Sequence, residues 1–106
     1  MVQRRWVYAA PITDLSPDRG RSVQVEGRWY ALFRTEDGTI LAIDDACPHE
    51  GTPLGEGAFH AGRVICGSHD WVFDARSGAC LNHPGVRVAC YATRLVGDAV
   101  EIAIDA

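Results

Sequence analysis

Short alternating or apolar stretches recur between turn signals along the whole chain, and this pattern constrains the fold more than any other feature. Glu26-Gly27 and Glu36-Asp37-Gly38 are hairpin signals between consecutive stretches. No segment has the spacing of an amphipathic helix. The sequence therefore predicts an all-β fold of about eight or nine short strands, a small antiparallel β-sandwich or barrel. The predicted strands cover residues 6–10, 22–25, 29–34, 39–43, 63–66, 71–74, 91–96 and 99–104.

Residues 44–62 interrupt the strand pattern. They hold four glycines and two prolines, which leave little room for regular structure. We therefore expect an irregular loop segment in this part of the chain.

The length and charge of the chain limit what it can do. A chain of 106 residues supports one hydrophobic core, so residues 1–106 are expected to form a single domain. The net charge of −4 argues against nucleic acid as a partner and favours docking onto a basic protein surface. No run approaches the ~18 apolar residues of a membrane span, and no apolar segment follows the N-terminal arginines. These features predict a cytoplasmic protein that does not enter a membrane.

Two pairs of residues could bind a metal: Cys47 with His49, and Cys66 with His69. Thiolates are soft ligands, and a set of thiolates and imidazoles suits either an iron–sulfur cluster or zinc. Zinc fingers pair Cys with Cys and His with His, whereas each pair here mixes the two types. The mixed pairs favour an iron–sulfur cluster, and a structural zinc-binding module is the alternative.

The pattern C-x-H, sixteen residues, C-x-x-H resembles the signature of the Rieske family. Residues 47–54 resemble its first cluster loop, 69–78 its second loop and the hairpin after it, and 91–102 its closing hairpin. The resemblance implies the Rieske iron–sulfur-protein fold, with a cluster-binding subdomain of two loops at about 45–57 and 66–71. It also implies one [2Fe–2S] cluster, with two cysteines on one iron and two histidines on the other. The implied ligands are Cys47, His49, Cys66 and His69.

Further positions suggest the kind of Rieske protein. Respiratory members have an extra cysteine in each cluster loop, where this chain has Thr52 and Ser68, so their disulfide cannot form. High-potential members have Ser and Tyr hydroxyl donors where this chain has Trp71 and Phe73. Fewer donors destabilise the reduced, more negative cluster, so we expect a potential of about −150 to 0 mV, at the low end of the Rieske range.

The resemblance is strongest to the ferredoxin components of ring-hydroxylating dioxygenase or aromatic monooxygenase systems. The chain ends about thirty-five residues after His69 and has no Gly-x-Gly-x-x-Gly fingerprint. We therefore expect an electron-transfer protein rather than an enzyme, a monomer that passes electrons from an NAD(P)H-dependent reductase to a terminal oxygenase. The alternative is the Rieske-like small subunit of an assimilatory nitrite reductase, which would expose a large apolar patch to its permanent partner.

Several other side chains have an expected place around the cluster. His60 and His83 are expected to be solvated loop residues, and Cys80 and Cys90 to be small buried residues on strands near the cluster. Trp71 is expected to pack behind the loops and exclude water. Pro84, after His83, resembles part of a third loop that screens the cluster.

Charges and backbone amides near the ligands have their own expected roles. Glu50, Glu56 and Asp70 flank the ligands, either as docking charges or as solvated side chains. The backbone amides of Gly51, Gly67 and Ser68 are expected to donate hydrogen bonds to the sulfurs, because tight turns direct successive N–H groups inward.

Overall fold

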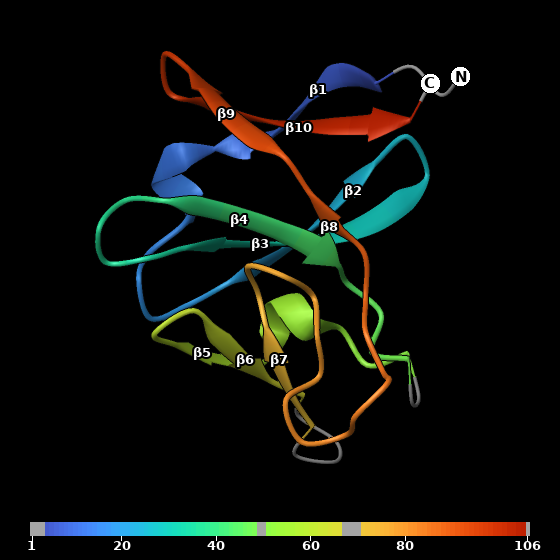
Figure 1. Ribbon diagram of the computed structural model, residues 1–106. Coiled ribbons are helices and arrows are strands. Elements are labelled where there is room, and N and C mark those ends of the chain that lie inside the picture. The colour runs from blue at the N-terminus through green and yellow to red at the C-terminus, as the bar shows by residue number, and fades with distance from the viewer. Residues whose placement is uncertain (1–3, 49–50, 67–70, 106) are drawn as a thin grey trace.

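The computed structural model describes residues 4–48, 51–66 and 71–105, and within these ranges ten strands form three antiparallel sheets (Figure 1). The first sheet has the order β1-β10-β9, with β1 at Arg4–Pro11, β10 at Ala99–Asp105 and β9 at Thr93–Val96. The second has the order β2-β3-β4-β8, at Arg21–Val25, Arg28–Arg34, Ile40–Asp44 and Cys90–Tyr91. The third has the order β5-β6-β7, at Ala58–His60, Arg63–Ile65 and Val72–Asp74. Two short 3-10 turns, η1 at Ile12–Asp14 and η2 at Leu54–Glu56, complete the elements.

The sheet β2-β3-β4-β8 is the middle layer, and both of its faces are buried. Successive side chains of a strand point to opposite faces. Tyr30 and Leu32 of β3 therefore belong to a core shared with β1 and β10, whereas Ala31 and Phe33 belong to a second core shared with β5, β6 and β7. This double burial explains why β3 reads as a continuous apolar run rather than as an alternating one.

The β2–β3 hairpin turns where the sequence predicts it. Glu26 and Gly27 both have positive φ, 52° and 83°, which is the backbone of a type I′ turn. Val25 and Arg28 pair across this turn, and the register continues to Arg21 opposite Leu32. A two-residue turn of this kind matches the twist of the strands and fixes their register.

The predicted fold class is confirmed: the protein is an all-β antiparallel sandwich to which the small sheet β5-β6-β7 is attached. Its sheets are open, so of the two predicted forms the sandwich is the correct one. The end with β5, β6 and β7 lies opposite the end with the chain termini (Figure 1).

Two details of the predicted strands are wrong. Residues 44–62 contain a strand, β5, which is only three residues long and lies between Gly57 and Gly62. Residues 91–96 form two strands rather than one, because the chain crosses at Ala92 from the middle sheet to the sheet β1-β10-β9.

In the part of the chain that the structure describes, no helix is long and apolar enough to cross a membrane.

Candidate metal centre

The small sheet β5-β6-β7 forms the base of the candidate site. Phe59, Val64 and Phe73 lie opposite one another across its three strands and are buried on its inner face. Phe33 of the middle sheet stacks on Phe59, with ring centroids 4.6 Å apart and planes at 23°. The sheet therefore packs against the sandwich through a buried aromatic contact.

The first predicted cluster loop closes on itself around Cys47. The N–H of Cys47 donates to the carbonyl of Thr52 at 2.9 Å, and the N–H of Gly51 donates to the carbonyl of Cys47 at 2.7 Å. Gly51 has a φ of 75°, a backbone conformation that residues with a side chain rarely adopt. Cys47 itself is 1% exposed. The loop thus holds one thiol at the edge of the core.

Asp45 closes the neck of this loop, a role that the sequence did not indicate. Its Oδ1 accepts a hydrogen bond from the Ser22 hydroxyl and another from the N–H of Gly55, both at 2.8 Å. Its carbonyl accepts the N–H of Leu54 at 2.6 Å. Asp45 is only 4% exposed, and its hydrogen bonds join the start of the loop to its end at Leu54 and Gly55 and to the neighbouring strand β2 at Ser22. An acidic residue directly after a strand is the one sequence signal that could have pointed to it.

Two glycines let the end of the loop approach its neighbours closely. A Cβ on Gly55 would lie 2.6 Å from the backbone nitrogen of Ser22, and a Cβ on Gly57 would lie 2.2 Å from the carbonyl oxygen of Ile65. Both distances are too short for any side chain. The loop is therefore seated by backbone contacts with β2 and β6 that only glycine permits.

The second predicted loop starts at Cys66, directly after β6. Its N–H donates to the carbonyl of Trp71 at 2.8 Å, and this hydrogen bond holds the two ends of the loop together. Cys66 is also 1% exposed. It belongs to the same buried core as Cys47, together with Phe33, Leu54 and Phe73.

The structure thus brings the two predicted thiol ligands together in one core, and neither is in a disulfide. The predicted imidazole ligands, His49 and His69, lie outside the described residues, as do Glu50, Gly67, Ser68 and Asp70. Among the described residues no three His, Cys, Asp or Glu side chains lie close enough to hold a metal. Two buried thiols outside disulfides, each at a closed loop, fit the sulfur half of a mixed Cys/His cluster site.

A third segment, residues 81–86, packs against the end of the second loop. The side-chain oxygen of Asn82 accepts the N–H of Val72 at 3.0 Å, and the N–H of Leu81 donates to the carbonyl of Val72 at 2.7 Å. The imidazole of His83 stacks on the indole of Trp71. Trp71 is half-buried and packs against the core that contains both cysteines, as predicted.

Three further expectations need correction. Cys90 is exposed, because it lies on the short strand β8 near the place where the chain leaves the middle sheet. His83 is half-buried in its aromatic stack rather than solvated. The N–H of Gly51 donates to the carbonyl oxygen of Cys47 rather than to a sulfur. His60 and Glu56 are exposed and Cys80 is 7% exposed, as expected for His60 and Cys80.

The carboxylate of Asp44 holds residues 89–91, which follow the third segment. Asp44, the last residue of β4, accepts the Tyr91 hydroxyl at 2.5 Å and the N–H of Ala89 at 3.0 Å. Burial, followed by the bond to Asp44, raises the pKa of Tyr91 well above its usual value. The neutral phenol therefore persists as a donor through the physiological range and ties β8 to β4.

Comparison with known proteins decides the family. The sequence matches the Rieske [2Fe-2S] domain over residues 5–92. The chain belongs to the Rieske family. Membership implies a Rieske-type [2Fe–2S] cluster as the cofactor, as the spacing of cysteines and histidines predicts.

Two solved structures match the chain over nearly their whole length. A Mycobacterium tuberculosis protein described as an NADH-dependent nitrite reductase small subunit is 28% identical, with a TM-score of 0.87 over 98% of both chains. The ferredoxin of carbazole 1,9a-dioxygenase from Nocardioides aromaticivorans IC177 is 29% identical, with a TM-score of 0.82 over 92% of this chain and 95% of that one.

The curated relatives are much longer proteins. Cholesterol 7-desaturase of Hemicentrotus pulcherrimus is 31% identical over 80 residues, which are 74% of this chain and 17% of the desaturase. The chain spans about a fifth of the length of the first curated relatives that it matches.

Proposed function

We propose that residues 1–106 form a single-domain Rieske ferredoxin, a one-electron carrier of the cytoplasm and not itself an enzyme. Cys47 and Cys66 are the ligands of one iron, and His49 and His69 are the ligands of the other. When bound, the [2Fe–2S] cluster supplies the reversible uptake of one electron. The observation that carries the proposal is a pair of buried thiols, neither in a disulfide, each on its own closed loop and both in one core.

The surroundings of these thiols support a low potential. The side chains at the two positions after the second loop, Trp71 and Phe73, offer no hydroxyl, and Phe73 is completely buried. Fewer donors and less water both disfavour the more negative reduced state. We therefore propose a midpoint potential of about −150 to 0 mV, the low part of the Rieske range.

The proposed partners are an NAD(P)H-dependent reductase as the donor and a terminal oxygenase as the acceptor. The similarity to a dioxygenase ferredoxin over nearly the whole of that chain supports this role. The test is anaerobic reduction of the purified protein by NADH with a ferredoxin reductase, followed by single-turnover reoxidation with a Rieske oxygenase. Reduction by one electron per chain and its reoxidation by the oxygenase are expected, and failure of both steps with an intact cluster would contradict the proposal.

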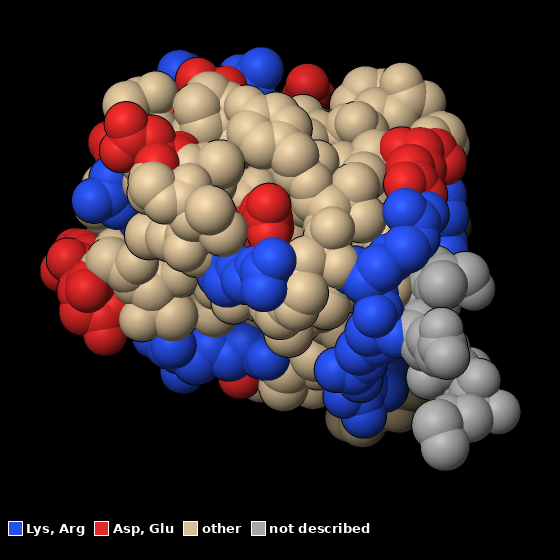
Figure 2. All heavy atoms as spheres, turned by 90° about the horizontal axis from the view of Figure 1, so that it is seen from above, with Lys and Arg blue, Asp and Glu red and all other residues tan. Residues whose placement is uncertain are grey.

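A second candidate is the small subunit of a nitrite reductase, and one surface favours it. Trp6 and Tyr8 of β1 and Leu95 and Val96 of β9 are between 39% and 55% exposed, at the end far from the cysteines. Figure 2 shows this face with uncharged surface between separate groups of acidic and basic side chains. Such a surface suits a permanent partner. Gel filtration separates the two roles, because a stable monomer at micromolar concentration favours the ferredoxin.

A further inference from the structure

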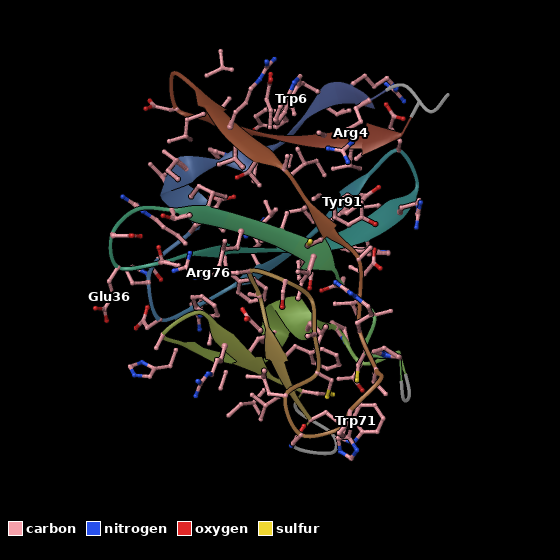
Figure 3. The ribbon with its side chains drawn as sticks, in the orientation of Figure 1. Arg4, Trp6, Glu36, Trp71, Arg76 and Tyr91 are labelled. Carbon is pink, nitrogen blue, oxygen red and sulfur yellow. The ribbon has the colours of Figure 1, made fainter. Side chains whose placement is uncertain are left out.

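The third segment touches the end of the second cluster loop through one aromatic pair. The imidazole of His83 lies 4.0 Å from the indole of Trp71 between ring centroids, with the planes at 29°. Both side chains are half-buried. Trp71 lies at the end of the molecule opposite Trp6 and Arg4 (Figure 3).

The position of His83 is set by contacts with the residue after Trp71. Val72 donates its N–H to the side chain of Asn82 and accepts the N–H of Leu81. The N–H of Val86 donates to the carbonyl of His83 at 3.2 Å, which closes the turn around Pro84. These backbone hydrogen bonds therefore place the imidazole beside the indole.

Trp71 connects this stack to the thiols in two ways. Its carbonyl accepts the N–H of Cys66, and its indole packs against the core that contains Cys47 and Cys66. One face of the indole thus covers the core, and the imidazole occupies space that water would otherwise fill.

We propose that His83 is a positioning residue, which holds the Trp71 indole against the sulfur-bearing core and so keeps water from the cluster. The inference rests on the proposed function, because it concerns the surroundings of the proposed ligand Cys66. Water stabilises the more negative reduced state, so loss of the stack raises the reduction potential. It also opens a path by which oxygen and water reach the cluster.

The test compares the holoprotein with His83→Ala, His83→Phe and the control His60→Ala, whose imidazole is exposed on β5. His83→Ala should raise the midpoint potential and bleach in air about two- to tenfold faster, the range expected when one aromatic stack is lost. His83→Phe restores a ring face and should behave like the wild type, as should His60→Ala.

His83→Gln serves where His83→Ala yields too little holoprotein, because Gln keeps a polar side chain of similar length but has no ring face. A raised potential in His83→Gln, with wild-type behaviour in His83→Phe, supports the proposal. Wild-type potential and bleaching rate in either His83→Ala or His83→Gln would overturn it. A wild-type protein without the EPR signal of a mixed-ligand cluster would instead show that the proposed function itself is wrong.

Discussion

The sandwich and the cluster-binding end are held together by different means. The sandwich has strands of up to eight residues, and its core consists of apolar side chains such as Leu32 and Ile102, which are fully buried. The cluster-binding end, which contains the sheet β5-β6-β7, has strands of three residues, three thiols in its core and a loop held by backbone contacts at Gly55 and Gly57. Short strands with few apolar contacts are weak by themselves. We therefore expect the sandwich to be stable through its own contacts, whereas the other end should gain much of its stability from the cofactor.

The largest effect is expected from Cys47→Ser. It removes a buried thiol from the loop around residues 45–57, so the cluster should be lost completely while the far-UV circular dichroism of the sandwich persists. Iron and sulfide assays on anaerobically purified protein measure the loss. Cys90→Ser is the matched control, because that thiol is exposed and free, and full iron content is expected. Full occupancy in Cys47→Ser would mean that Cys47 is not a ligand.

The same substitution, Leu to Ala, tests the two cores separately. Leu32 and Leu54 are both fully buried, one in the sandwich core and one in the core with the cysteines. Each change to Ala should lower the free energy of unfolding by about 2–5 kcal/mol, measured by denaturation in urea. Only Leu54→Ala should also speed the release of iron to a chelator. Equal release rates in the two variants would show that the two ends form one cooperative unit.

Two glycine substitutions, one at each end of the molecule, should differ in their effect on cluster binding. Gly57→Ala places a Cβ against the carbonyl of Ile65, which should cost about 1–3 kcal/mol and reduce cluster incorporation. Gly38→Ala is the control, since its φ of 89° strains the side chain although no atom lies within 4 Å of the new Cβ. It should cost about 1–2 kcal/mol in the sandwich hairpin and leave the iron content unchanged. Iron loss in Gly38→Ala but not in Gly57→Ala would show that the loop at Gly57 does not support cluster binding.

The smallest effect is expected from Tyr91→Phe, which removes the bond to Asp44 and about 1 kcal/mol of stability. The raised pKa of Tyr91 means that its contribution is complete below the ordinary tyrosine pKa of about 10 and is lost as pH rises through the higher folded value. Urea denaturation from pH 8 to 11 should therefore show a steeper alkaline decline in the wild type than in Tyr91→Phe.

The exposed Tyr8 provides the control for this last comparison. Tyr8→Phe should keep the alkaline decline of the wild type, because this change leaves the bond between Tyr91 and Asp44 intact. An identical decline in all three proteins would show that the contact between Tyr91 and Asp44 does not stabilise the fold.

The sequence predicts most of the sandwich, because its strands are long enough to show alternation and its turns carry Gly. It also predicts the two thiol ligands, because Cys47 and Cys66 stand in a spacing that few other sites share. It could not predict β5, which is too short to show a period, or the break at Ala92, which depends on where another sheet lies. The roles of Asp45 and His83 depend on partners that are distant in sequence, such as Ser22 and Trp71, and the position of Asp45 directly after a strand does not by itself identify those partners.

The central claim is that Cys47 and Cys66 bind one iron and His49 and His69 the other. The most direct test is the EPR spectrum of anaerobically purified protein reduced with dithionite, with iron and sulfide assays on the same sample. A rhombic signal with the low average g value of mixed His/Cys ligation, and two irons and two sulfides per chain, are the predicted result. A silent spectrum with one zinc per chain, unchanged after anaerobic reconstitution with iron and sulfide, would contradict it and make this end a structural zinc module.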